Sequence, residues 1–164
     1  MNQKQENLYN ELASKYNFNK GQKEQIKLGI ENNVNVLIYA KPEFDRYQME
    51  QIRRGLERNL DVSFYAKTEF DWAQMGLIRL GLKNNLDISI YATPEFKYEQ
   101  MNQIYPGLDK NLNVSIYANP EFNNMQMYQI RTGLENNIDV TPYLNPGIDY
   151  EEMERIREKL ERNK

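Results

Sequence analysis

The chain has 164 residues, of which 40% are apolar and 27% are charged, the composition of a globular domain with a hydrophobic core. It contains no cysteine and no histidine, which excludes disulfides, thiolate catalysis, thiolate metal sites and the commonest general base. Its net charge of −3 gives no overall attraction for nucleic acid, and no apolar run approaches the roughly 20 residues of a membrane span.

Residues 1–33 are predicted to form a degenerate N-terminal capping unit. Their polar segment QENLYNELASKYNF suits the outer end of a stack of helices. A weak copy of the pattern found farther along the chain follows, through Phe18, Gln22, Ile26, Gly29 and Ile30.

Residues 34–144 are predicted to form regular repeats with a period of 26 residues. The hexapeptide YAKPEF at 39–44 returns as YAKTEF at 65–70, and a tyrosine and a methionine recur at the same interval. A fixed period in this range indicates a stacked array, because one unit cannot bury its apolar face alone. The recurring residues are Tyr39, Tyr65, Tyr91, Tyr117 and Tyr143, and Met49, Met75, Met101, Met127 and Met153.

Each repeat is predicted to begin with a long helix of about 13 residues. Asp45 and Gln48 have the spacing of a capping box, and Phe44 and Met49 have that of a hydrophobic staple. An apolar stripe at helical spacing follows the cap and is expected to be buried. Lys97 stands at the cap position of a later repeat, where its side chain cannot accept the capping hydrogen bond.

A very short helix is predicted to follow each long one. Asn59 and its equivalents are expected to end the long helix in the left-handed conformation, which asparagine tolerates. Asp61 can then cap a short helix from Val62 to about Ala66. Gly55 interrupts the long helix at a cost of about 1 kcal/mol relative to alanine. We therefore expect the short helix of a neighbouring unit to approach the backbone of Gly55 closely.

Residues 145–164 are predicted to form a C-terminal capping helix. The segment YEEMERIREKLERNK is charged on all but one stripe, as expected for the outer face of a terminal helix. The whole chain, residues 1–164, is thus predicted to be a single repeat domain. Its fold class is all-α, a short α-solenoid of 26-residue repeats, each with one long helix plus one very short helix. The hand of the solenoid stays open.

The repeats read Q-M-x-x-I-R-x-G-L, then D-V-S-x-Y-A and P-E-F, most regularly from Tyr39 to Tyr143. They resemble a 26-residue helical repeat of Firmicutes phage and mobile-element proteins. The resemblance implies an accessory protein in the cytoplasm of a bacterial host cell. An inhibitor of a host defence system is the sharpest function that it implies, and it carries no catalytic residue.

An arginine column runs through the repeats, at Arg53, Arg79, Arg131 and Arg157. Such a column could bind phosphates, as in nucleic-acid-binding repeats. A glutamate follows three of these arginines after four residues, so we expect those three to be paired on their own helices. Arg79 is the exception, because residue 83 is lysine.

Exposed positions of the middle repeats are predicted to bind a protein partner. Trp72 is the only tryptophan, Arg79 lacks the glutamate, and Pro106 is expected to kink its helix. Tryptophan, tyrosine and arginine commonly anchor interfaces, although lateral packing, a dimer contact or drift in a tolerant array would also explain these features. The predicted partner-binding residues are Trp72, Gly76, Arg79, Leu80, Tyr98, Asn102, Tyr105 and Tyr128.

The function predicted from these observations is that of a non-enzymatic binding protein that grips a protein partner. The alternative is a solenoid that binds nucleic acid or nucleotides through its arginine and tyrosine columns. Enzymatic activity comes third, because a nucleophile such as Ser63 would lack a histidine base. We expect no catalytic residue, no metal, no cofactor and no membrane binding, a monomer or weak homodimer, and a cytoplasmic location.

Overall fold

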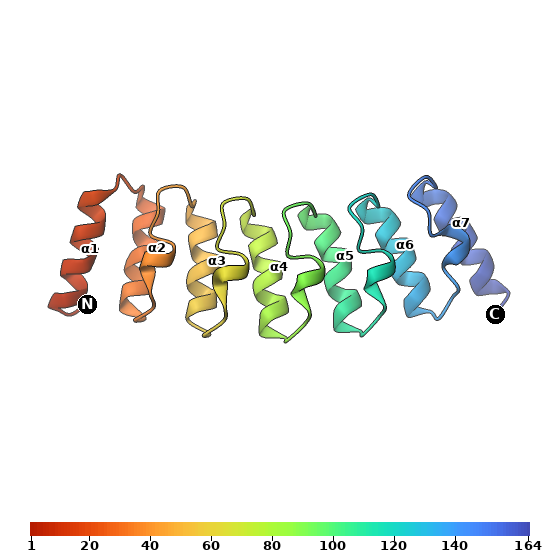
Figure 1. Ribbon diagram of the computed structural model, residues 1–164, viewed down its shortest axis with the longest axis horizontal. Helices are drawn as coiled ribbons and strands as arrows, with labels where there is room; N and C mark the ends of the chain where they lie inside the picture. Colours follow the sequence, from red (N-terminus) through yellow and green to blue (C-terminus); the bar gives the residue numbers. More distant parts are fainter. The chain divides into compact units, whose positions relative to one another are not determined.

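The computed structural model describes all residues from Met1 to Lys164 and contains helices and no strands (Figure 1). The long helices are α1 (Gln3–Lys15), α2 (Lys20–Glu31), α3 (Arg46–Leu56), α4 (Trp72–Lys83), α5 (Tyr98–Asp109), α6 (Asn124–Glu135) and α7 (Tyr150–Arg162). One-turn 3₁₀ helices are η1 (Val36–Ile38), η2 (Val62–Phe64), η3 (Ile88–Ile90), η4 (Val114–Ile116) and η5 (Thr141–Tyr143). The predicted all-α fold with one long and one very short helix per repeat is confirmed. No helix has the length and apolar character that a membrane span requires.

The chain divides into two compact parts, an N-terminal half, residues 1–84, and a C-terminal half, residues 85–164. In the N-terminal half, α1 packs on α2, α2 on α3 and α3 on α4. In the C-terminal half, α5 packs on α6 and α6 on α7. Each half is therefore a stack of repeats in chain order. The prediction of a single repeat domain stays a prediction.

The helix termini follow the local sequence. The Asp45 carboxylate accepts from the amides of Tyr47 and Gln48, and the Gln48 side chain accepts in return from the amide of Asp45. At the other end of the helix, Asn59 adopts a φ of 55°, in the left-handed region. Its equivalents also have a positive φ: Asn33, Asn85, Asn111 and Asn137. Asn163 at the end of α7 differs, with a φ of −97°. Lys97 makes no side-chain capping bond, as predicted.

The short helices are one turn long, shorter than predicted. In the second repeat η2 ends at Phe64, where the chain turns so that the ring of Tyr65 is fully buried. The Tyr65 hydroxyl donates to the carbonyl of Gln51, at 3.2 Å, and so ties the short helix to α3. The recurring methionines are also fully buried, so the tyrosine and methionine columns form the core predicted from the period.

Gly55 is in close contact with its surroundings, but not in the way predicted. The side chains beside it are those of Val62 and Tyr65, from the short helix of the same repeat and not from the backbone of a neighbouring one. A Cβ atom built on Gly55 would lie 2.8 Å from Cγ1 of Val62 and closer still to the Tyr65 hydroxyl. The glycine therefore makes room for the tyrosine ring that closes the repeat.

In both halves of the chain, a glutamine side chain joins one repeat to the next. The Gln48 amide, whose oxygen caps its own helix, donates through Nε2 to the carbonyl of Phe70, at 2.7 Å. Gln100 donates in the same way to the carbonyl of Phe122, at 2.7 Å. The sequence predicted the capping bond, whereas the bond to the next repeat spans 22 residues and was not predicted.

Pro106 does not end α5, which runs unbroken to Asp109. The proline stands in the last turn, where the loss of its N–H removes only one bond of the helix. The carbonyl of Pro106 still accepts from the amide of Lys110, at 3.1 Å. The helix thus continues through the proline, and the expected kink stays a prediction.

Candidate binding surface

The arginine column is built into the joints between repeats. Arg53 donates through Nε to the side-chain oxygen of Gln25, 28 residues earlier, at 3.0 Å. The same bond joins Arg79 to Gln51, Arg131 to Gln103 and Arg157 to Gln129. These arginines therefore hold neighbouring long helices together. Arginines that served only to bind phosphate would not need such bonds within the chain.

Three of these arginines are also paired with a glutamate on the same helix, as predicted. Arg157 lies 2.7 Å from Glu161, and the pairs Arg53–Glu57 and Arg131–Glu135 are equivalent. Burial alone would raise the pKa of the Glu57 carboxyl, but hydrogen bonds from Asn32 and Arg53 outweigh it, so that the pKa is lowered. These carboxylates are thus charged at neutral pH and satisfy the arginines beside them.

Arg79 differs from the other three arginines. Its Nε atom is held by Gln51, at 3.0 Å, but no carboxylate lies within ion-pair distance of it. Burial lowers the pKa of the Arg79 guanidinium, and the nearby cations Arg54 and Arg58 lower it further, against the opposite effects of Tyr65 and the Glu50 carboxylate. The prediction that Arg79 has no glutamate partner is confirmed. Its Nε atom nevertheless has an acceptor, the side-chain oxygen of Gln51.

Large exposed side chains gather at the N-terminal ends of α3 and α4. The rings of Tyr47 and Trp72 are 5.9 Å apart and tilted, and the Arg46 guanidinium lies 4.2 Å from the centre of the Tyr47 ring. Trp72 is 51% exposed and Tyr47 is 44% exposed. The stem of Arg46 lies against Gly21 of α2, where a Cβ atom would be 2.6 Å from Cδ of the arginine. We call Arg46, Tyr47 and Trp72 the aromatic strip.

The other predicted residues of the N-terminal half lie farther along α4. Gly76 is partly exposed, and a Cβ atom there would meet nothing nearer than the side-chain oxygen of Gln51, at 3.6 Å. Leu80 is partly exposed and lies one residue after Arg79. Both residues are thus accessible on the same helix as Arg79.

The remaining predicted residues belong to the C-terminal half. Tyr98 is 36% exposed at the start of α5, and Asn102 is exposed one turn later. Tyr105 is partly buried, and it is engaged with other residues. Tyr128 of α6 is 41% exposed, and the Arg131 guanidinium lies 5.4 Å from the centre of its ring. The assignment of these four residues to a partner site stays a prediction.

Two features of the surface were missed from the sequence, and one of them left a readable signal. Tyr47 was not predicted to belong to the surface, although it is part of the aromatic strip. The glutamine acceptors recur as Gln25, Gln51, Gln103 and Gln129, so their recurrence was the readable signal. Position 77 of that column is leucine, and Tyr105 stands in place of an arginine 28 residues later.

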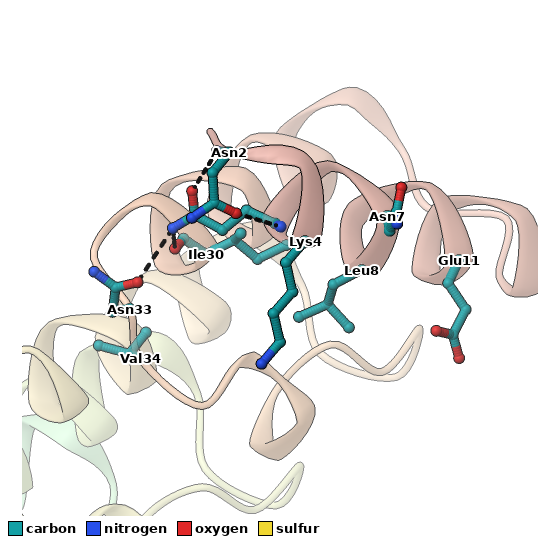
Figure 2. A pocket seen from close by; sticks show the side chains of 9 residues that line it. Asn2, Lys4, Asn7, Leu8, Glu11, Ile30, Asn33 and Val34 are labelled. Carbon is teal, nitrogen blue, oxygen red and sulfur yellow. Dashed lines mark hydrogen bonds between the residues drawn. The ribbon is translucent and has the colours of Figure 1, made fainter.

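A shallow pocket of about 500 Å³ lies between α1 and the end of α2 (Figure 2). The Gln5 amide donates there to the carbonyl of Ile30, at 2.9 Å, and to the side-chain oxygen of Asn33, at 3.1 Å. Leu8 and Val34 supply apolar walls. The Gln5 bonds place the start of α1 beside the end of α2, so the two helices are antiparallel.

The structure offers few groups for catalysis or metal binding. No set of three or more acidic side chains is placed to hold a metal ion. The Ser63 hydroxyl donates to the Asp61 carboxylate, at 2.6 Å, in the first turn of a short helix. Burial raises the pKa of the Tyr65 hydroxyl, which is held as a donor and not as a nucleophile.

Comparison of the chain with protein families, with curated proteins and with solved structures finds no match. The candidate surface therefore has to be interpreted from its own geometry.

Proposed function

We propose that this chain is a non-enzymatic binding protein that grips a protein partner with exposed side chains of its middle repeats. The partner docks on the aromatic strip and on the adjoining face of α4 that carries Gly76, Arg79 and Leu80. The observation that carries the proposal is Trp72, the only tryptophan, which leaves half of its surface to solvent.

The aromatic strip has the properties of an interface anchor. Tryptophan, tyrosine and arginine are the side chains most often found at the energetic centre of protein interfaces. Here Tyr47 and Trp72 contact each other and Arg46 covers the tyrosine ring, so the three side chains lose little freedom when a partner binds. None of the three is needed to fill the core, because the tyrosine and methionine columns already do so.

Nucleic-acid binding has weaker support. Arg53, Arg131 and Arg157 are each bound to a glutamine and a glutamate, so a phosphate would have to displace existing partners. A single arginine without a carboxylate does not make a phosphate track, which needs several cations in a row.

A narrower proposal concerns the role of the complex. The repeat resembles that of Firmicutes phage and mobile-element proteins, which supports an inhibitor of a host defence component acting in the bacterial cytoplasm. This proposal rests on the resemblance alone.

The experiment is retention of host proteins from a Firmicutes lysate on immobilised wild-type, Trp72→Ala and Arg155→Ala chains, followed by quantitative mass spectrometry. We expect one retained protein to bind Trp72→Ala roughly thirtyfold more weakly, since loss of an anchor costs at least about 2 kcal/mol. Arg155, exposed on α7, is the matched control and should leave retention unchanged. Thermal unfolding of each variant separates lost affinity from lost stability.

The proposal fails if every retained protein binds Trp72→Ala as well as it binds the wild type while Trp72→Ala keeps its fold. Loss of thermal stability without loss of binding would make Trp72 part of the scaffold.

A further inference from the structure

Three repeats contain the same built carboxylate position. In the first of them the Glu57 carboxylate accepts from Arg53 of its own helix and from Asn32 of the preceding repeat, the latter at 2.6 Å. Glu135 accepts equivalently from Arg131 and lies 2.8 Å from Lys110, and Glu161 accepts from Arg157 and from Asn136, at 2.7 and 2.8 Å. The two donors always come from four and 25 residues before the glutamate.

The repeat of α4 has both donors and no carboxylate. Arg79 stands four residues before Lys83, and Arg58 stands 25 residues before it. Arg58, Arg79 and Lys83 take part in no ion pair. At the place where the other repeats hold an anion, this repeat thus presents three cations.

The cations are held ready for a ligand. The Gln51 side chain orients Arg79 through its Nε atom and leaves the two terminal nitrogens without a protein acceptor. Arg58 reaches the carbonyl of Arg54, at 3.3 Å, and is close enough to Arg79 to lower the pKa of that guanidinium, which burial lowers most. Gly76 adds no side chain beside Gln51, so the approach to Arg79 stays open.

We propose that an acidic segment of the protein partner places a side-chain carboxylate between Arg58 and Arg79, in the position that glutamate takes in the other repeats. This inference rests on the proposed function and names the chemistry of the partner. The site shares α4 with Trp72, so one partner can bring an acidic residue to Arg79 and an apolar surface to the aromatic strip.

Comparison of this repeat with the three repeats that hold a glutamate favours a carboxylate over a phosphate as the ligand of Arg58 and Arg79. The two equivalent positions, an arginine with an asparagine or a lysine, already bind a glutamate carboxylate in three repeats, and the repeat of α4 has Arg79 and Arg58 there. The arginines of those repeats are neutralised within the chain, so the cluster at Arg79 is isolated and does not continue as a row of cations along the column.

The test compares wild-type protein with Lys83→Glu, which supplies the absent carboxylate from within the chain. The probes are labelled oligoglutamate, oligoglutamine and oligothymidylate. Their binding is measured by fluorescence polarisation at low salt. Lys83→Glu should weaken binding of oligoglutamate by roughly tenfold or more, because an internal anion then occupies the donors. Its melting temperature should rise, because Arg79 and Arg58 gain a partner.

Lys67→Glu is the matched control, because it makes the same change in net charge at another exposed position of the N-terminal half. It should weaken binding of oligoglutamate by less than about threefold, as expected for a general change of field. The proposal is overturned if the wild type binds oligoglutamate no better than oligoglutamine, if the two lysine variants are weakened equally, or if Lys83→Glu gains no stability.

The choice of probes and variants also separates this inference from the proposed function on which it rests. Tight binding of oligothymidylate that Lys83→Glu abolishes would assign the site to phosphate and contradict both proposals. A partner whose retention depends on Trp72 but not on Lys83 would keep the protein-binding function and overturn the carboxylate site.

Discussion

Two helical glycines, Gly55 near the end of α3 and Gly76 within α4, differ in what lies beside them. Gly55 faces Val62 and Tyr65 of its own short helix, whereas Gly76 faces only the side-chain oxygen of Gln51, at 3.6 Å. Helix propensity alone would favour alanine at both positions. The difference in stability between alanine variants at the two positions therefore measures the packing of Gly55 against the buried tyrosine.

Gly55→Ala should lower the free energy of unfolding by about 1–3 kcal/mol, because the added methyl group overpacks Val62 and Tyr65. Gly76→Ala should raise it by about 0.4–1 kcal/mol, because the methyl group fits and the unfolded chain loses freedom. Urea denaturation of both variants measures the two changes. Equal effects of the same sign would show that the ring of Tyr65 does not require a glycine at residue 55.

At the scale of the element, the third residue of α3, Gln48, does two tasks at once, as do its equivalents in α2, α5 and α6. Its amide oxygen caps its own helix, and its amide nitrogen reaches a carbonyl before the next helix. The column reads Gln22, Gln48, Gln74, Gln100 and Gln126, and then Glu152 in the last helix. A glutamate oxygen can perform the capping task, but it cannot donate. Glu152 of α7 can therefore cap its helix but cannot make the second bond.

Gln48→Glu should lower the free energy of unfolding by about 1–3 kcal/mol at neutral pH, because it leaves the buried carbonyl of Phe70 without a donor. The loss relative to wild type should shrink in acid, where the protonated carboxyl can donate again. Glu152→Gln is the matched control and should change stability by no more than about 0.5 kcal/mol. Comparable losses in the two variants would show that the bond between repeats contributes little.

At the scale of the whole molecule, charge is distributed unevenly along the chain. Residues 1–84 contain thirteen Lys and Arg against eleven Asp and Glu, and residues 85–164 contain eight against thirteen. The net charge of −3 therefore hides a weakly basic N-terminal half and an acidic C-terminal half. Lys83 belongs to the basic half, which is consistent with an acidic partner there.

Acid should destabilise both halves through the same carboxylates. The pKa values of Glu57 and Glu135 are lowered from the ordinary 4.5, because hydrogen bonds and cations outweigh burial. A carboxyl whose pKa is lower in the folded chain stabilises it above the unfolded pKa, and that stability is lost as pH falls through the folded pKa. We expect the melting temperature to fall steadily below about pH 4.5 and less steeply in Glu57→Gln. An unchanged slope in that variant would contradict the assignment.

Much of the fold could be predicted from the sequence, because its determinants are local. The cap at Asp45, the left-handed Asn59 and the buried methionine column each depend on residues within one repeat. The bond from Arg79 to Gln51 and the contact between Tyr47 and Trp72 depend on the offset between neighbouring helices, which a period does not specify. Trp72 and Arg79 could be recognised in the sequence as the only tryptophan and as an arginine with no glutamate four residues later. The residues that contact them could be identified only from the structure.

The glutamine joint has a consequence for how such a gene can change. Residues 46–71 carry both the donor for a following repeat, Gln48, and the acceptor for a preceding one, the carbonyl of Phe70. A tandem copy of these 26 residues would therefore join at both ends through a bond that the chain already uses. Insertion or deletion of one whole repeat would keep this joint, and the new copy would add exposed positions that are free to vary.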